Sequence, residues 1–439
     1  MTNDTIASIA TPHGVGGIAV LRISGDEAVR IANTLANVEL KPRKAQFARI
    51  RHEGRTIDEA VVTYYKSPQS YTGEDVVEIS CHGSLYVQQE LLRACIVLGA
   101  RLAEPGEYTL RAFLNGKMDL AQSEAVADLI DATSEAQHRL ATNQLRGGFS
   151  KKLAEIRDRF VYLTSMMELE LDFSDEEVEF ADRSQLSSIV DELRQEISRL
   201  VDSFKKGNAI KQGIPVTIVG RPNVGKSTLL NALLNDERAI VSDIPGTTRD
   251  TIEDSVVLGG FTFRFIDTAG IRNSSDSIEQ AGIERSYRSA EKSQVILFVT
   301  DDPTLQDFHE FSQQCSLSDQ KVGKILNKCD QHAYNTIEPD CLILSAKTGE
   351  GMDSLLNCLT DFASITPDAT LLTNVRHHEA MIHILEVLDN VREGILNQLP
   401  ADLVVIDIRE ALYHLGLITG QVSNDEVLKN IFSRFCIGK

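Results

Sequence analysis

The chain has 439 residues, well above the ~150 residues of a typical domain, so more than one domain is expected. Apolar residues make up 42% and charged residues 25%, which is a composition typical of globular proteins. The 64 acidic and 44 basic residues give a net charge of -20. This balance excludes a stand-alone nucleic-acid binder, because affinity for phosphates depends on basic side chains.

The sequence also indicates the cellular compartment of the protein. No apolar run approaches the ~18 residues that a membrane span needs, and the N-terminal segment lacks the basic start and apolar stretch of a signal peptide. The seven cysteines are scattered without a C-x-x-C pair, and an odd count argues against a disulfide framework. These features exclude secreted and membrane-spanning proteins and predict a cytoplasmic protein with no membrane partner.

Four segments with different patterns are expected along the chain. Residues 1–117 contain short β-type runs separated by turn residues, which predicts an α+β domain. Residues 118–212 lack proline and carry apolar residues at helical spacing, as expected for the first part of a helical domain. Strands and helices alternate through residues 213–369, and residues 370–439 are helical again. The predicted fold class is therefore multidomain α/β, with a doubly wound domain inserted into a helical domain.

A phosphate-binding loop opens the third segment. The apolar run Ile214–Val219 predicts a buried strand, and it leads into G-R-P-N-V-G-K-S-T at residues 220–228 and then into a helical sequence. This is G-x-x-x-x-G-K-[ST] in its strand–loop–helix setting, where glycine N–H groups and the helix N-terminus bind phosphates. Lys226 is expected to bridge the β- and γ-phosphates and act in catalysis, and the Ser227 hydroxyl to hold Mg²⁺.

Further motifs follow predicted strands in the same segment. A carboxylate can accept two hydrogen bonds side by side, and guanine, unlike adenine, presents adjacent N1–H and N2–H donors. We assign this role to Asp330, with Asn327 on the other edge of the base and the Ala346 N–H facing O6. Motifs in this order at strand ends predict a GTPase domain. They are D-T-A-G at 267–270 after the strand 261–266, N-K-C-D at 327–330 after 322–326, and S-A-K at 345–347 after 341–344.

The catalytic group must differ from that of many GTPases, which orient the attacking water with a glutamine just after D-x-x-G. Here that position is Ile271, so either hydrolysis is very slow or another group acts. In the polar segment 242–250, Thr248 can reach Mg²⁺. Oxygen ligands for a monovalent cation, which could replace an arginine finger electrostatically, are offered by Asn223, the carbonyls of Ser242 and Ile244, and Thr247.

The expected GTP-binding residues share a place in one of these motifs. They are Asn223, Val224, Gly225, Lys226, Ser227, Thr228, Ser242, Asp243, Ile244, Pro245, Gly246, Thr247, Thr248, Asp267, Thr268, Ala269, Gly270, Asn327, Lys328, Asp330, Ser345, Ala346 and Lys347.

Along nearly its whole length the chain resembles the bacterial tRNA-modification GTPases of the MnmE family, also called TrmE or ThdF. The resemblance implies that the GTPase domains dimerise when K⁺ is bound, and that Glu279, with Glu284 as second choice, positions the attacking water. By the same resemblance the K⁺ ligands are Asn223, Ser242, Ile244 and Thr247. The segments that carry it are residues 16–25, 71–75, 105–108, 111–115 with 117, the GTPase motifs, and F-C-I-G-K at 435–439.

The resemblance also implies that the first domain dimerises and binds a tetrahydrofolate derivative in its 5-formyl or methylene form. The folate contacts implied by motif are Arg22, Glu78, Lys117 and Lys439. Basic side chains suit the glutamate tail of folate, and a carboxylate suits the amino-pyrimidine edge of its pterin ring. Cys436, in the C-terminal motif, is a candidate for a thiol role, with a purely structural cysteine as the alternative.

The function implied by the resemblance is GTP hydrolysis coupled to modification of the tRNA wobble uridine. An aminomethyl or carboxymethylaminomethyl group is placed at C5, with its carbon supplied by folate. An FAD-binding partner, the MnmG protein, forms a heterotetramer or larger complex and brings most of the tRNA-binding surface, which agrees with the acidic charge of this chain. The alternative is a ribosome-assembly GTPase of the Era and Der type, against which the missing basic RNA-binding domain argues.

Overall fold

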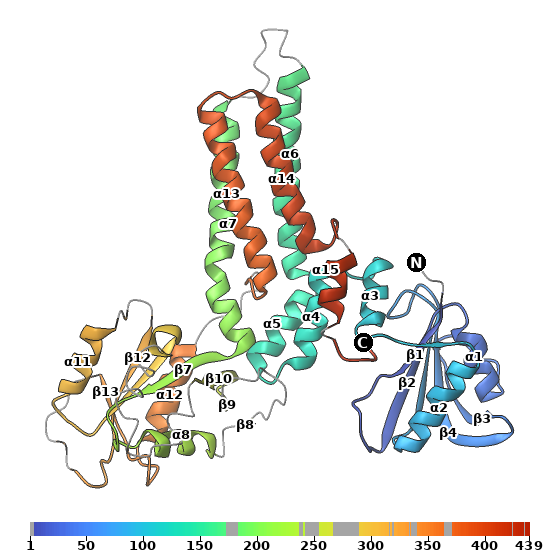
Figure 1. Ribbon diagram of the computed structural model, residues 1–439, viewed down its shortest axis with the longest axis horizontal. Helices are drawn as coiled ribbons and strands as arrows, with labels where there is room; N and C mark the ends of the chain where they lie inside the picture. Colours follow the sequence, from blue (N-terminus) through green and yellow to red (C-terminus); the bar gives the residue numbers. More distant parts are fainter. Residues whose placement is uncertain are drawn as a thin grey trace. The chain divides into compact units, whose positions relative to one another are not determined.

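The computed structural model describes most of the chain, in two compact units (Figure 1). The first unit comprises residues 1–127, 145–181 and 398–439, and the second comprises 128–144 and 182–397. Within the described residues, no helix has both the length and the apolar character needed to span a membrane. Those residues are 4–172, 183–236, 240–241, 254–266, 289–315, 317, 320–332, 334, 340–363, 371–423, 425–433 and 435–439.

The first unit contains a six-stranded sheet in the order β3-β4-β5-β2-β1-β6. Neighbouring strands run antiparallel, except that β1 and β6 are parallel. Its elements are β1 (Ile6–Ile9), β2 (Ile18–Ser24), α1 (Ala28–Ala36), β3 (Ala45–His52), β4 (Arg55–Tyr65), β5 (Val76–His82), α2 (Leu85–Val97), β6 (Arg101–Leu102) and α3 (Glu107–Leu114).

Helices α1 and α2 cover one face of this sheet. Leu21 of β2 and Ile79 of β5 lie in the same buried cluster as Ile31 of α1 and Leu91 of α2. Successive side chains on a strand point to opposite faces, so polar residues next to these apolar ones lie on the other face. The expected α+β domain is confirmed, and its alternation gives the sheet a second, polar face.

Long helices follow, and each presents an apolar stripe. In α6 the buried residues Leu153, Ile156, Phe160 and Leu163 recur every three or four positions, as the sequence predicted. This spacing keeps one side of a helix against a neighbour. The helices outside the two sheet domains are α4 (Leu120–Asp131), α5 (Glu135–Leu145), α6 (Gly148–Asp172), α7 (Arg183–Gln212), α13 (Val375–Leu396), α14 (Ala401–Thr419) and α15 (Asp425–Phe432).

These helices form one packed pair in each unit. In the first unit α6 packs along α14, with Arg409 of α14 2.8 Å from Glu168 of α6. In the second unit α7 packs along α13, and Figure 1 shows the two side by side. The ion pairs between these two helices are Arg194–Asp389 at 2.5 Å and Arg392–Asp191 at 2.9 Å, so α7 and α13 run antiparallel.

The second unit also contains a seven-stranded sheet in the order β13-β12-β11-β7-β10-β9-β8. The first five of these strands are parallel, and β9 and β8 add antiparallel pairs at one edge. Its elements are β7 (Ile214–Val219), α8 (Lys226–Leu234), β8 (Ile240–Val241), β9 (Asp254–Leu258), β10 (Phe261–Phe265), β11 (Val295–Thr300), α11 (Gln306–Gln314), β12 (Lys321–Leu326), β13 (Cys341–Ile343) and α12 (Met352–Ala363).

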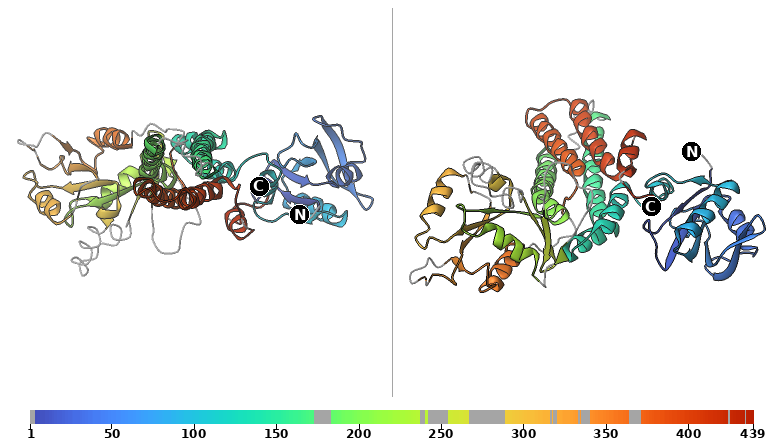
Figure 2. Two further views of the ribbon diagram at one scale, coloured as in Figure 1. Left: turned by 90° about the horizontal axis from the view of Figure 1, so that it is seen from above. Right: turned by 60° about the horizontal axis from the view of Figure 1, so that its bottom comes forward.

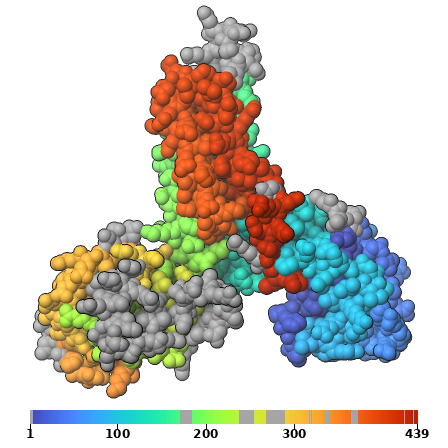
Figure 3. Space-filling view, viewed as in Figure 1, coloured from blue at the N-terminus to red at the C-terminus, as the bar shows by residue number. Residues whose placement is uncertain are grey.

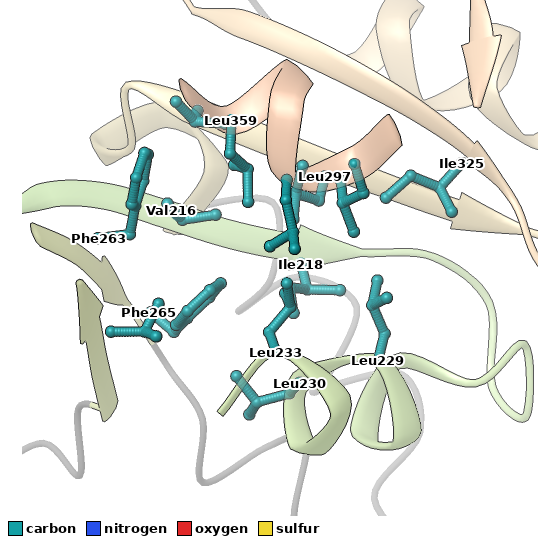
Figure 4. Packing of buried hydrophobic residues seen from close by; sticks show 14 of the residues in the cluster. Val216, Ile218, Leu229, Leu230, Leu233, Phe263, Phe265, Leu297, Ile325 and Leu359 are labelled. Atoms are coloured by element: carbon teal, nitrogen blue, oxygen red, sulfur yellow. The ribbon is translucent and has the colours of Figure 1, made fainter. Parts of the chain in front are cut away.

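Both faces of the parallel sheet are buried. Figure 4 shows Leu229 and Leu233 of α8 and Leu359 of α12 pointing toward Ile218 and Leu297 of the central strands. A second cluster brings other residues of the same strands against α11: Phe298 packs on Phe311. Parallel sheets need helices on both faces. The predicted doubly wound domain is therefore confirmed, and β7, the strand before the glycine loop, has the bounds that the sequence predicted.

The C-terminal segment returns to the first domain. Leu428, Phe432 and Phe435 pack with Leu120, and α15 lies against α3. Figure 3 shows this red segment against the neighbouring cyan residues, and both views of Figure 2 mark the C-terminus beside the N-terminal domain. Gly106 has no room for a side chain, because a Cβ there would lie 2.5 Å from the Phe432 carbonyl oxygen. The last residues of the chain thereby reach the polar face of the first sheet.

Candidate functional site

Two glycines shape the loop between β7 and α8. A Cβ on Gly220 would lie 2.1 Å from the carbonyl oxygen of Val299, and one on Gly225 would lie 2.2 Å from Asn327 Nδ2. Gly225 also has a φ of +104°, in the region that favours glycine, and it immediately precedes the first residue of α8. At these two glycines the loop backbone therefore lies in direct contact with the Val299 carbonyl and the Asn327 side-chain amide. A loop that binds phosphates through its backbone N–H groups requires such close packing.

Lys226 is folded back over this loop. Its Nζ donates hydrogen bonds of 2.8 Å to the Gly220 carbonyl oxygen and 2.7 Å to that of Arg221. Burial lowers the pKa of the Lys226 ammonium. Since α8 begins at Lys226, the N–H groups of its first turn lack intrahelical acceptors and carry partial positive charge. A cation, a helix N-terminus and the glycine loop thus meet at one place, and this set fits bound phosphates.

The residues expected to read the base come together at the ends of β12 and β13. Asn327 is buried, and its Nδ2 donates 2.7 Å to the Val224 carbonyl oxygen while its Oδ1 accepts from the Ala346 N–H at 2.9 Å. Asp330 Oδ1 accepts a 2.7 Å hydrogen bond from the Ser345 hydroxyl, which lowers the pKa of the Asp330 carboxyl. One amide side chain therefore ties the glycine loop to the S-A-K segment.

The other predicted nucleotide residues divide into two groups. Asn223 is exposed in the glycine loop with a φ of 62°, and Ser227 lies in the first turn of α8. Thr228 and Lys347 are exposed, and Lys328 is half-buried. Outside the described residues lie Ser242, Asp243, Ile244, Pro245, Gly246, Thr247, Thr248, Asp267, Thr268, Ala269, Gly270, Glu279 and Glu284.

A second polar site lies on the open face of the first sheet. Arg22 of β2 and Glu78 of β5 are direct neighbours in the antiparallel register, and Arg22 Nε and Nη2 both donate to Glu78 Oε1, at 3.0 and 2.8 Å. The Arg22 guanidinium lies 5.4 Å from the Tyr71 ring centroid and 5.5 Å from that of Tyr108. Its Nη1 donates 3.3 Å to the Gly438 carbonyl oxygen, so the C-terminal tail closes one side.

The remaining residues predicted for this site are placed differently. Lys117 donates 2.9 Å to the Pro68 carbonyl oxygen and is exposed, while Lys439 is half-buried next to Gly438. The Cys436 side chain is exposed, and its carbonyl oxygen accepts from the Gly106 N–H. Sequence reasoning assigned no role to Tyr71 or Tyr108, because their approach to Arg22 depends on the fold.

A network of charged residues surrounds α3, the helix that contains Tyr108. On α3, Arg111 donates to the Asp4 and Glu107 carboxylates at 2.8 and 3.0 Å, and to Glu74 at 3.1 Å. Arg101 donates to the same Asp4 and Glu107 carboxylates, both at 2.6 Å. The hydrogen bond from Arg101 lowers the pKa of Asp4. Tyr108, between Glu107 and Thr109 on this helix, donates its hydroxyl to the Arg22 carbonyl oxygen at 2.8 Å.

The glycine loop, the Lys226 cation and the linked N-K-C-D and S-A-K segments define a P-loop protein that binds guanine nucleotides. Known families agree with this class: the TrmE N-terminus of GTP-binding proteins matches residues 5–117, and the MnmE helical domain matches residues 120–436. The chain belongs to the MnmE family of tRNA modification GTPases, whose members bind GTP and Mg²⁺.

Relatives from two bacteria match along their whole length. The tRNA modification GTPase MnmE of Flavobacterium johnsoniae is 46% identical over 465 residues, covering 100% of this chain and 100% of the relative. That of Parabacteroides distasonis is 49% identical over 459 residues, covering 99% of this chain and 100% of the relative.

Among solved structures, the G domain of the T. maritima FeoB iron transporter is 25% identical and covers 34% of this chain and 99% of its own, with a TM-score of 0.24. Era, in complex with MgGDPNP and nucleotides of 16S ribosomal RNA, is 26% identical and covers 39% of this chain and 66% of its own, with a TM-score of 0.26. At TM-scores this low, the likeness to Era does not favour a ribosomal function.

Proposed function

We propose that this GTPase hydrolyses GTP to GDP and phosphate in a K⁺-dependent manner and, with an FAD-containing partner, modifies C5 of the tRNA wobble uridine. The group installed is carboxymethylaminomethyl or aminomethyl, built with a folate one-carbon unit. The observation that carries the proposal is the match to MnmE relatives along the full chain, at 46% and 49% identity. The residues of the nucleotide site also support the proposal.

At the nucleotide, the chain supplies positive charge and backbone donors. Lys226 leaves the carbonyl oxygens of Gly220 and Arg221 and takes up the β- and γ-phosphates, whose charge compensates for the burial of the ammonium. The Ser227 and Thr228 segment at the start of α8 adds hydroxyl and N–H groups. The residues that would hold Mg²⁺ are Ser227 and Thr248, with Asp267 of the D-T-A-G motif as a further carboxylate, and the bound ion would neutralise charge that develops on the phosphates.

At the base, Asp330 accepts hydrogen bonds from guanine N1–H and N2–H. The Ser345 hydroxyl fixes the orientation of that carboxylate, and the neighbouring Ala346 N–H is hydrogen-bonded to Asn327. The lowered pKa of Asp330 keeps the carboxylate ionised, so it can only accept. Adenine would place the wrong groups against it, and the site therefore favours GTP over ATP.

For hydrolysis, we propose that Glu279 positions the attacking water, with Glu284 as the second choice. The residues that would hold K⁺ are Asn223, Ser242, Ile244 and Thr247, and the bound ion would supply positive charge in place of an arginine finger. The exposed Asn223 in the glycine loop is consistent with this ligand set. Glu279→Ala should keep GTP affinity and slow hydrolysis about a hundredfold or more. Unchanged turnover in Glu279→Ala would transfer the role to Glu284.

The polar site of the first domain is proposed to bind the tetrahydrofolate derivative, as a 5-formyl or methylene form. Glu78 is held by Arg22 through one carboxylate oxygen, Oε1, and the Arg22 guanidinium packs against the rings of the half-buried Tyr71 and the fully buried Tyr108. A carboxylate fits the amino-pyrimidine edge of the pterin, and of the two rings only the half-buried Tyr71 is open to a flat ligand. Lys117 and Lys439 are the cations proposed for the glutamate tail, and the exposed Cys436 is retained as a possible thiol in the chemistry.

The proposed assembly is a homodimer that joins the FAD-binding MnmG protein in a heterotetramer or larger complex, in the cytoplasm. The net charge of -20 supports a division in which that partner holds most of the tRNA. Removing the gene should abolish the modified wobble uridine in bulk tRNA and leave ribosome profiles normal. Abnormal ribosomal subunits with normal wobble uridine would instead support the Era- and Der-like alternative.

A further inference from the structure

An ion pair next to the guanine-reading residues joins Lys328, one of the expected GTP-binding residues, to Asp301, which has no part in the functions proposed so far. Asp301 follows the last residue of β11, and Lys328 lies two residues beyond the end of β12. These strands are parallel neighbours with Thr300 opposite Leu326, and the Asn327 N–H donates 2.8 Å to the Thr300 carbonyl oxygen. The strand ends thereby bring Lys328 Nζ to 2.7 Å from Asp301 Oδ2.

The backbone at Lys328 is unusual for a long side chain. Its φ of 66° lies in the left-handed region, which residues with a Cβ seldom adopt. The adjacent Asn327 holds this conformation from both sides, because its side chain bonds Val224 and Ala346 and its carbonyl oxygen accepts 2.7 Å from the Tyr334 hydroxyl. Asp301 then fixes the far end of the Lys328 side chain.

The Asn, Lys and Asp side chains of the N-K-C-D motif therefore each have a fixed partner. Asn327 is tied to the glycine loop, Asp330 is held by Ser345, and Lys328, between them in sequence, is held by Asp301. A free lysine has a flexible four-carbon stem and loses much rotamer freedom when a ligand orders it. Because Lys328 is already paired before the nucleotide binds, this loss of rotamer freedom is removed from the binding step.

We infer that Asp301 is a positioning residue for guanine-nucleotide binding, which acts by ordering the Lys328 side chain beside the base site. Asp301 itself need not touch the nucleotide. Because the pre-ordering serves GDP and GTP alike, both affinities depend on it to the same degree. The inference uses the guanine-nucleotide binding of the family and does not depend on K⁺, folate or tRNA.

The test is a double-mutant cycle on the affinity of the full-length protein for a fluorescent GDP analogue. Asp301→Asn should raise Kd about three- to tenfold, the range expected when one rotamer-rich side chain must be ordered on binding. Lys328→Met should raise it at least as much, and adding Asp301→Asn to Lys328→Met should change Kd less than about twofold. The same ratios are expected with a non-hydrolysable GTP analogue.

The matched control is Asp302→Asn, which removes the same charge one residue away. Asp302 Oδ1 accepts from the Thr304 N–H and hydroxyl instead of from a lysine, so this variant should bind GDP like the parent. Parent-like binding by Asp301→Asn, or the same loss in the Lys328→Met background, would overturn the inference. If Asp301→Asn fails to fold, parent-like binding by Lys328→Met alone would also overturn it.

Discussion

The nucleotide site is formed mainly by backbone groups, whereas the polar site of the first domain is formed mainly by side chains. The nucleotide site uses backbone at short loops after parallel strands, and its close contacts, at Gly220 and Gly225, leave no room for a side chain. The polar site uses long side chains on a sheet face, where Arg22 meets Glu78, Tyr71 and the carbonyl oxygen of Gly438.

This difference predicts that the two sites are sensitive to different kinds of substitution. A backbone cradle is held by the strands and helices on either side of it, so it should fail when a small group is added to a glycine. A cluster of charged side chains is held by mutual pairing, so it should fail when one partner is removed or neutralised. Single substitutions at the two sites should therefore separate these two kinds of failure.

Gly225→Ala should damage the nucleotide site most. The new Cβ would lie 2.2 Å from Asn327 Nδ2 at a φ of +104°, so it adds a clash to backbone strain. We expect the Kd for GDP to rise at least about a hundredfold, measured by isothermal titration, with little change in the first domain. Gly349→Ala is the control: its φ of +84° adds strain, but no atom lies within 4 Å, so binding should change only a few-fold. Parent-like affinity in Gly225→Ala would contradict the cradle.

Arg111→Met should damage the first domain and spare nucleotide binding. It removes the guanidinium that Asp4, Glu74 and Glu107 share and leaves Asp4 and Glu107 paired with Arg101. Breaking a buried pair such as Arg111–Glu107 costs about 3 to 5 kcal/mol of unfolding free energy. Hydrogen exchange in residues 4–114 of the full chain would measure the loss. Arg49→Met removes an exposed pair with Glu59 and should cost less than about 1 kcal/mol. Equal losses in the two variants would refute the distinction.

Asp330→Asn should change base preference without destabilising the domain. An amide places a donor where the carboxylate accepted, so the preference for GTP over inosine triphosphate, which lacks the N2 amino group, should fall about ten- to a hundredfold. Competition binding would measure it, with the exposed Asp340→Asn as the control. Comparable affinity of the parent protein for GTP and ATP would contradict the assignment of Asp330 as the residue that recognises guanine.

Acid should weaken the first domain through the same carboxylates. The hydrogen bond from Arg101 lowers the pKa of Asp4; for Glu107, burial opposes the hydrogen bonds from Arg101 and Arg111, which prevail and lower its pKa. A carboxyl with a lowered folded pKa stabilises the protein above its unfolded value, about 4, and loses that contribution as pH falls through the folded pKa. Hydrogen exchange in residues 4–114 should therefore rise steeply below about pH 4, and less steeply in Arg111→Met. Parallel curves would mean that other groups govern acid unfolding.

The sequence predicted much of the nucleotide site, because its chemistry is local. Lys226 and Asp330 each stand in a short motif at a strand end, and the strand before the glycine loop was predicted at Ile214–Val219. The register that sets Arg22 beside Glu78 could not be read from spacing, and neither could the approach of Tyr71. Such contacts join residues far apart in the chain and depend on the completed fold. The pairing of Asp301 with Lys328 was missed for the same reason.

We propose that GTP hydrolysis by this chain is activated by a monovalent cation bound beside the phosphates. Steady-state GTP hydrolysis, compared in K⁺ and in Na⁺ at equal ionic strength over a range of protein concentrations, tests it most directly. We predict strong activation by K⁺ that increases with protein concentration, as expected when Asn223 and its proposed neighbours hold the cation and the domains dimerise. Equal rates in the two salts would leave a GTPase but contradict this mechanism.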